Sequence, residues 1–211
     1  MRQHAEADTV VRTAAFEDLD QLVSAYLAAF ADEAVASWAG LISESGPTDP
    51  ELFREQQRQA VANGEILVAE RDETIIGVSV WVEADSGERF RREAVELGRI
   101  AAERPELLRT ATVLELVASR HPDQPHLYLS SMAVHPDHRG SGVGGALLRF
   151  RLAQADAVGL PTHLEASTQQ SQRLYERYGF RSVGSPLQVP DGGPRLQPMW
   201  RGGGIHQEMS G

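Results

Sequence analysis

The 211-residue sequence contains no cysteine and no lysine, so all 20 of its cationic side chains are arginine. The lack of cysteine excludes disulfides, thiolate metal sites and a cysteine nucleophile, and it suits a reducing compartment. The lack of lysine excludes Schiff-base chemistry and a phosphate-binding lysine of the Walker A type. Together these absences remove several classes of covalent catalysis and cofactor binding.

Long apolar runs are also missing. No stretch approaches the length needed to span a membrane, and residues 1–8 carry two acids and no apolar run, unlike the hydrophobic region of a signal peptide. We therefore expect a cytoplasmic protein without a membrane partner.

Positive charge is scarce relative to negative charge, with 20 Lys and Arg against 30 Asp and Glu and a formal net charge of −10. Such a surface repels a phosphate backbone, so we expect no nucleic-acid partner. An acidic protein attracts cationic molecules, although net charge more often reflects solubility. With 41% hydrophobic residues the chain can bury one core, and we expect a single domain over residues 1–211, with flexible ends at 1–9 and 202–211.

Apolar periodicity predicts an alternation of strands and helices. Strands are expected at residues 10–12, 66–70, 75–83, 126–134, 162–166, 181–185 and 195–201, and helices at residues 16–30, 50–63, 85–120, 142–157 and 170–178. Asp49 is the expected N-cap of the second helix, and Pro105 is expected to divide the long helical segment in two. The order of elements indicates an α/β fold with mixed strand pairing and helices on both faces of the sheet.

The most informative segment is a glycine-rich turn between a strand and a helix. Four glycines, Gly140, Gly142, Gly144 and Gly145, fall within six residues. They let the backbone bend closely around a ligand, and the unpaired N–H groups at a helix start carry the positive end of the helix dipole. Such a turn binds phosphate. The alternative is a flexible helix start without a ligand.

The same glycines also satisfy the G-x-G-x-x-G fingerprint of dinucleotide-binding proteins, with Glu165 about 20 residues further on. Two features argue against this interpretation. Residues 135–139 separate the strand from the first glycine, and only about 65 residues follow the turn, fewer than the rest of a dinucleotide-binding sheet needs. We therefore do not expect an oxidoreductase.

Two segments together resemble one known family. Residues 139–144, Arg-Gly-Ser-Gly-Val-Gly, are similar to the R/Q-x-x-G-x-G/A signature of the GNAT superfamily of N-acetyltransferases, and residues 174–180, Leu-Tyr-Glu-Arg-Tyr-Gly-Phe, are similar to its L-Y-x-x-x-G-F segment. Within this superfamily the sequence is most similar to the puromycin N-acetyltransferase group, for example over residues 134–138 and 193–195. The resemblance covers roughly residues 10–201.

The resemblance implies a mixed, mostly antiparallel twisted sheet that is split between its fourth and fifth strands, with helices on both faces and a helical insertion before the fourth strand. It implies acetyl-CoA as the acyl donor. Its binding residues would be Met132, Ala133 and Val134 along the pantetheine arm, and Arg139, Gly140, Ser141, Gly142, Val143, Gly144 and Gly145 around the pyrophosphate. One residue departs from the family pattern: Thr168 stands where an asparagine is often found.

Acetyl transfer to an amine needs a donor for the oxyanion and a proton for the departing thiolate. The resemblance places Tyr175 beside the thioester, so Tyr175 is the candidate acid, because a phenol can donate a hydrogen bond to sulfur at neutral pH. The alternative is an ordinary core tyrosine. The main-chain N–H of Val134 is the candidate oxyanion donor.

Glu165, at a strand end, is the candidate base, acting directly or through water, and the alternative is a solvated carboxylate. Glu83, Trp81 and Phe30 are candidate substrate-binding residues, although a tryptophan is more often part of a core. The seven histidines lack a zinc-type spacing, so we expect no metal site.

The expected partner is a small-molecule amine, such as an aminonucleoside-type antibiotic, and the protein is expected to be a monomer or a homodimer. A protein or peptide amine is an alternative acceptor that the sequence does not exclude. A non-catalytic acyl-CoA-binding module is a further alternative, but it would not require Tyr175, so catalysis is favoured.

Overall fold

The computed structural model describes residues 9–30, 33–40, 42–43, 46–47 and 49–202. In this part of the chain, eight strands form one sheet in the order β1-β4-β5-β6-β7-β10-β8, with β9 paired to β10. The strands are β1 (Val10–Thr13), β4 (Ile66–Arg71), β5 (Thr74–Ala84), β6 (His126–Val134), β7 (Thr162–Ala166), β8 (Arg181–Ser182), β9 (Leu187–Gln188) and β10 (Arg195–Arg201). Two short strands, β2 (Ile42–Ser43) and β3 (Gly46–Pro47), pair separately.

The strand pairing confirms the mixed, mostly antiparallel sheet. Every pair in the described sheet is antiparallel except β6 with β7, which lie parallel. These two strands are matched over three positions only, from Leu127 opposite Thr162 to Leu129 opposite Leu164. Beyond Leu129, β6 continues to Val134 beside β5. The sheet is therefore split between its fourth and fifth long strands.

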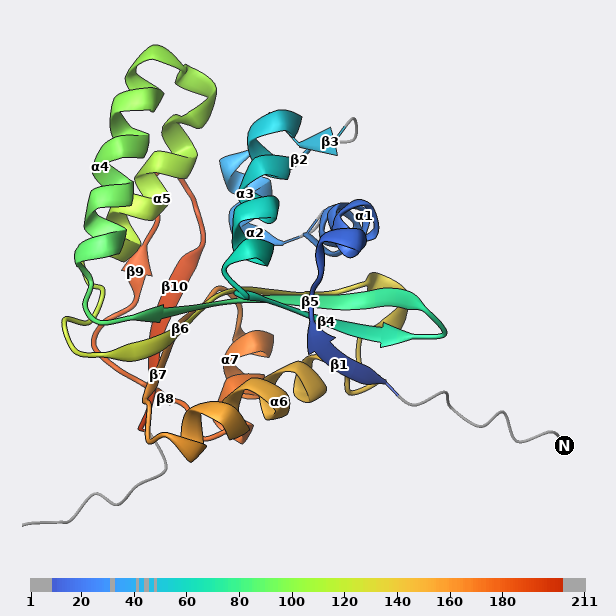
Figure 1. The fold of residues 1–211 in the computed structure, drawn as a ribbon. Coiled ribbons are helices and arrows are strands. Elements are labelled where there is room, and N and C mark those ends of the chain that lie inside the picture. The colour runs from blue at the N-terminus through green and yellow to red at the C-terminus, as the bar shows by residue number, and fades with distance from the viewer. Residues whose placement is uncertain (1–8, 31–32, 41, 44–45, 48, 203–211) are drawn as a thin grey trace, which may run out of the picture.

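Helices cover both faces of the sheet (Figure 1). One face carries η1 (Phe16–Asp18), α1 (Leu19–Phe30), α2 (Ala34–Ala39) and α3 (Pro50–Ala62), and the other carries α6 (Val143–Ala157) and α7 (Gln169–Arg177). The predicted insertion is a pair of helices, α4 (Glu88–Glu103) and α5 (Leu108–Ala118), joined by η2 (Pro105–Leu107), and η3 (Pro136–His138) follows β6. Within the described residues, no helix is both long enough and apolar enough to cross a bilayer.

Alternation along the strands divides the core between the two faces. In β5, Ile76 packs in the cluster with Leu147 and Leu148 of α6, whereas its neighbour Ile75 packs in the cluster with Leu22 of α1. The helix starts follow from local sequence: Asp49 accepts the Leu52 N–H at 2.9 Å, and Pro50 occupies the first turn of α3, as predicted.

Several elements differ from the sequence prediction. The helix expected from residue 142 begins at Val143, with Gly142 as its N-cap, and the strand expected at 181–185 ends at Ser182. Helix α2 was not predicted, because its six residues are too few to show an amphipathic period. Strands β2, β3 and β9 have two residues each and were missed for the same reason. The flexible ends expected at 1–9 and 202–211 lie outside the described residues, apart from Thr9 and Gly202.

Replacing Leu147 by alanine is expected to lower the free energy of unfolding by about 2–5 kcal/mol. Leu147 is fully buried where α6 meets the sheet, so the shorter side chain leaves a cavity. Val158→Ala serves as the control, because Val158 is 72% exposed and should change stability by about 0.5 kcal/mol or less. Urea denaturation measures both, and similar values for the two variants would contradict the packing described.

Candidate active site

A cavity of about 1370 Å³ is lined by both strands of the split and by helices from both faces of the sheet. Its walls include the glycine turn before α6, the end of β6, Glu165 of β7, Tyr175 of α7 and Phe30 of α1. The cavity is therefore continuous from the predicted phosphate-binding turn to the helices of the opposite face. A cavity of this volume is large enough to bind a small-molecule ligand along the split.

The glycine turn has the backbone that its sequence predicts. Gly140 and Gly142 have φ angles of 77° and 88°, in the left-handed region that other residues rarely adopt. The N–H of Ala146 donates to the Gly142 carbonyl at 2.9 Å. The three N–H groups before it, at the first turn of α6, point out of the helix end without an intrahelical acceptor. Such N–H groups are a candidate anion-binding position, and the residues that carry them line the cavity.

Gly145 permits close packing behind this turn. A Cβ atom at Gly145 would collide with the Tyr178 hydroxyl group, which accepts a hydrogen bond from Arg149 at 2.9 Å. At Gly144 a Cβ atom would lie in ordinary contact, 3.6–3.8 Å from Leu174, Met132 and Val134. Of these two residues in α6, only Gly145 therefore leaves room that a larger residue would fill.

Arginine side chains gather at the same end of the cavity. Arg139 donates to the Val134 carbonyl at 3.2 Å and to the Ala29 carbonyl at 3.1 Å, so it ties the glycine turn to β6 and α1. Arg139, Arg149, Arg173 and Arg177 all line the cavity. This end therefore carries concentrated positive charge, which suits a phosphate-bearing ligand.

The exposed edge of β6 follows from its hydrogen bonds to β5. The His135 N–H donates to the Ile76 carbonyl at 2.9 Å, and alternate residues of an antiparallel strand bond to the same neighbour. Ala133 therefore directs its main-chain groups to β5, whereas those of Met132 and Val134 face the split. Of the three residues predicted along the pantetheine arm, Ala133 thus differs from the other two, and its side chain packs on α1 and α2.

Tyr175 lines the cavity and is also part of the core. Its side chain is 7% exposed, and its ring lies 5.9 Å from that of Phe180, edge to face. Burial, with a smaller effect of the nearby Glu33 charge, raises the pKa of Tyr175, so its phenol is protonated at neutral pH. The two roles predicted for Tyr175, proton donor and core residue, are compatible in this position.

Glu165 is held by two side chains that the sequence did not identify. The Tyr128 hydroxyl group donates to Glu165 Oε2 at 2.8 Å, and His163 Nε2 lies 2.8 Å from Oε1. The Glu165 side chain is 7% exposed, so the alternative of a solvated carboxylate is wrong. Because residues two apart on a strand share a face, the sequence could have placed His163 beside Glu165. Tyr128 belongs to β6, so its contact with Glu165 depends on the parallel register of β6 and β7.

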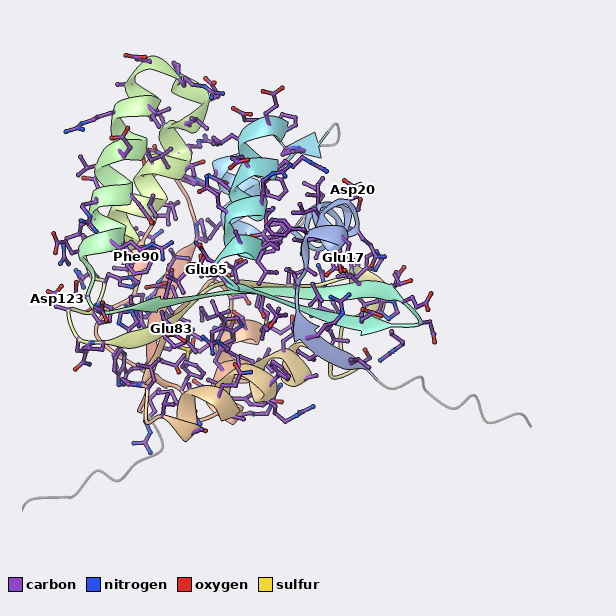
Figure 2. The ribbon with its side chains drawn as sticks, in the orientation of Figure 1. Glu17, Asp20, Glu65, Glu83, Phe90 and Asp123 are labelled. Atoms are coloured by element: carbon purple, nitrogen blue, oxygen red, sulfur yellow. The ribbon has the colours of Figure 1, made fainter. Side chains whose placement is uncertain are left out.

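Trp81 and Glu83 do not line this cavity. Trp81 is 2% exposed in the core beside α6, and its indole N–H donates to Ser79 Oγ at 2.8 Å. Glu83 lies on the same side of the sheet, where it pairs with Arg151 of α6 at 2.7 Å (Figure 2). Both predictions of substrate binding are corrected: two residues apart on β5, these side chains share the face covered by α6, away from Phe30 and α1.

The part of the cavity wall that comes from α1, α2 and α3 is aromatic and acidic. Phe30 stacks on Tyr26 with ring centroids 4.2 Å apart, and Phe53 meets Tyr26 edge to face at 5.4 Å. Burial raises the pKa of Tyr26 to about 12, so its hydroxyl group stays neutral and donates to Ser131 Oγ at 3.0 Å. The carboxylate of Glu33 lines this end and accepts the N–H groups that begin α2.

Charge is therefore distributed unevenly over the cavity wall. Arg139 lies in the glycine turn and the other three arginines belong to α6 and α7, whereas Glu33 and Asp49 cap α2 and α3 on the other face of the sheet and Glu165 belongs to β7. Of the acidic and aromatic lining residues, sequence reasoning identified Phe30 and Glu165 and missed Glu33, Tyr26 and Phe53. Helical periodicity predicts that Tyr26 and Phe53 lie on the apolar faces of their helices. Periodicity alone does not show whether such a face lines a cavity or packs in a core.

The histidines also come together. One ring nitrogen each of His121 and His163 and one carboxylate oxygen of Glu165 lie within 4.8 Å of one another. His121 precedes β6, and His163 and Glu165 belong to β7, so no short sequence spacing connects the three residues. A search of the sequence for metal-binding motifs could therefore not have identified this cluster.

Comparison with known proteins places this geometry in a family context. The model of the acetyltransferase (GNAT) family matches residues 27–180. An agmatine N-acetyltransferase mutant in its apo form is 18% identical, with a TM-score of 0.71 over 92% of this chain and 99% of the other. A polyamine N-acetyltransferase from Drosophila melanogaster is 19% identical, with a TM-score of 0.69 over 92% and 100%. A histone acetyltransferase HPA2-related protein from Corynebacterium glutamicum is 24% identical, with a TM-score of 0.62 over 94% and 98%.

Proposed function

Because this chain belongs to the acetyltransferase (GNAT) family, whose acyl donor is acetyl-CoA, we propose that it acetylates the amino group of a small cationic molecule that also carries an apolar or aromatic part. The observation that carries this proposal is the distribution of charge over the wall of one continuous cavity, with arginines and first-turn helix N–H groups on the side of the glycine turn, α6 and α7 and carboxylates beside aromatic rings on the side of α1, α2 and α3.

The donor occupies the arginine end in this proposal. The first-turn N–H groups of α6, with the left-handed Gly140 and Gly142 before them, hold the pyrophosphate. The main-chain groups of Met132 and Val134 that face the split bond the pantetheine arm, and Arg139 keeps the turn docked against β6. Ser141 and Val143 contribute to the binding loop through their backbone.

The chemistry follows from three groups near the split. Glu165 accepts a proton from the incoming ammonium group, directly or through water, which leaves a nucleophilic amine. The amine nitrogen attacks the thioester carbon, and the Val134 N–H stabilises the negative charge that develops on the carbonyl oxygen. The carbon–sulfur bond then breaks, and Tyr175 gives its proton to the departing thiolate. The second proton leaves the nitrogen as the amide forms and returns through water to the Tyr175 phenolate, and the proton on Glu165 passes to solvent.

The acceptor occupies the end lined by Phe30, Tyr26 and Phe53. Aromatic rings bind a planar or apolar group, and Glu33 supplies a negative charge for a cation. The proteins of similar fold include agmatine, polyamine and arylalkylamine N-acetyltransferases, which act on small amines. An aminonucleoside-type antibiotic has the same combination of an amine and aromatic groups, and it belongs in the acceptor panel.

Replacing Glu33 by glutamine is expected to raise KM about tenfold for an acceptor with a second positive charge, with little change for one without it. The amide oxygen can still accept the Val35 and Ala36 N–H groups, so α2 keeps its cap while the charge is lost. A tenfold change corresponds to about 1.4 kcal/mol, within the range for a hydrogen bond to a charged group.

Steady-state kinetics with matched acceptors, for example a diamine and the monoamine of equal length, measure this difference. A similar increase in KM for both acceptors would remove Glu33 from cation recognition. If short peptides instead gave the highest kcat/KM, the small-molecule acceptor would be wrong.

A further inference from the structure

The cluster of His121, His163 and Glu165 has features that acetyl transfer does not require. His121 and His163 are 4% and 2% exposed, and the Glu165 side chain is 7% exposed. A fourth histidine, His126, is fully buried beside them, with its Nε2 3.0 Å from His121 Nε2. Three imidazoles and a carboxylate are thus enclosed together at the wall of the cavity, which Glu165 lines.

Backbone carbonyls determine which nitrogens of two of these rings carry hydrogen. His163 Nδ1 lies 3.0 Å from the Met199 carbonyl, and His126 Nδ1 lies 2.7 Å from the Gln124 carbonyl. A carbonyl oxygen only accepts, so both Nδ1 atoms donate, and in the neutral rings both Nε2 atoms have free lone pairs. Metal-binding histidines are commonly oriented in this way, by a carbonyl bound to the other ring nitrogen.

The lone pair of His163 Nε2 points at another acceptor. Glu165 Oε1 is 2.8 Å away, and Glu165 Oε2 already accepts the Tyr128 hydroxyl group. Two acceptors at this distance need a cation between them, either a shared proton or a metal ion. The Tyr128 contact also fixes the orientation of the carboxylate, as an outer partner does for a metal-ligating carboxylate.

His121 supplies a third lone pair without a partner of its own. Since His126 Nε2 is an acceptor, His121 Nε2 must donate to it, which leaves Nδ1 of His121 unprotonated. That nitrogen is fully buried and has no hydrogen-bond partner among the residues that the structure describes. Its lone pair is therefore a potential metal ligand.

We propose that His121, His163 and Glu165 form a binding site for a divalent transition-metal ion of the zinc class. Two imidazole nitrogens and one carboxylate oxygen are a ligand set that zinc uses, and the cavity beside Glu165 leaves a fourth position for water. The proposal goes beyond acetyl transfer and does not depend on it. Metal binding and acetyl transfer are linked through Glu165. A metal ion bound to Glu165 Oε1 would prevent this carboxylate from accepting a proton, so metal binding opposes acetylation.

Titration of the untagged, chelator-treated full chain with ZnCl2 tests the proposal by calorimetry, in the absence of acetyl-CoA and any acceptor. About one equivalent is expected to bind, and Co²⁺ is expected to give the visible absorption of a low-coordinate site. Glu165→Gln keeps the size of the side chain and an acceptor for Tyr128, and His163→Gln removes the second ligand. Each should weaken zinc binding at least about tenfold.

His135→Ala is the matched control, because His135 is a partly exposed histidine in the loop near His138 and lies outside the cluster. It should leave zinc affinity unchanged, and circular dichroism checks that all variants are folded. If the wild-type chain binds no zinc, or binds it equally well in Glu165→Gln and His163→Gln, the proposal is overturned and the cation between His163 and Glu165 is a proton. Because no acyl transfer is measured, this outcome leaves the proposed function untouched.

Discussion

The Tyr175→Phe variant is expected to retain acetyl-CoA affinity and to lose acetylation activity, with kcat lowered about a hundredfold or more. The buried phenol is protonated because burial raises its pKa, and it lines the cavity at the split. Phenylalanine keeps the ring and its contact with Phe180 and removes only the proton that the departing thiolate needs. Stopped-flow measurement of turnover and calorimetric measurement of the acetyl-CoA Kd separate the two effects.

Tyr178→Phe is a suitable comparison, since Tyr178 also lines the cavity but its hydroxyl group contacts Arg149 beside Gly145. That variant should alter acetyl-CoA affinity more than kcat. If Tyr175→Phe instead lowers the unfolding temperature and the acetyl-CoA affinity while kcat at saturation is preserved, then Tyr175 is a packing residue.

The second large effect is expected at Gly142. A Gly142→Glu substitution should weaken acetyl-CoA binding about a hundredfold. A residue with a Cβ atom is strained at a φ of 88°, at a cost of about 1–3 kcal/mol, and the added carboxylate would repel the phosphates that we propose to bind here. No atom of the described residues lies within 4 Å of a Cβ atom at this position, so we expect the effect to come from the backbone and the ligand rather than from a clash.

Gly64→Glu separates the effect of backbone strain from the effect of the added carboxylate on acetyl-CoA binding. Gly64 has a φ of 69° and equally open surroundings, and it follows α3 outside the residues that line the cavity. It should lose similar stability and keep full acetyl-CoA affinity. Acetyl-CoA binding that survives Gly142→Glu would remove the phosphate cradle from the mechanism.

The sequence predicted the elements that have a strong period or a clear boundary signal. The strand at residues 126–134, the hairpin of β4 and β5 and the break at Pro105 are all present, because alternation, turn residues and proline act locally. The helices at residues 85–120 were also predicted from periodicity, whereas the split sheet came from the family resemblance. The split cannot be derived from periodicity, since it depends on which strands become neighbours.

The candidate site was predicted in part, for the same physical reason. The glycine turn is a local feature and lies where it was expected, whereas the environment of Glu165 is assembled from β6 and β7 and depends on their register. Trp81 and Glu83 were assigned to the site on residue type alone, and the sequence does not reveal which face of β5 meets α6. The histidine cluster joins residues far apart in the chain, so only the folded structure brings them together.

The central claim is that this chain transfers an acetyl group from acetyl-CoA to a small cationic amine. Release of free thiol from acetyl-CoA, followed with a thiol-reactive dye, tests it most directly, and the cysteine-free chain adds no background. With puromycin, polyamines, aminoglycosides and short peptides as acceptors, thiol release should depend on one of the small cationic amines and match the amount of acetylated product. Acetyl-CoA that binds but releases no thiol with any acceptor would contradict the claim and indicate a non-catalytic acyl-CoA-binding protein.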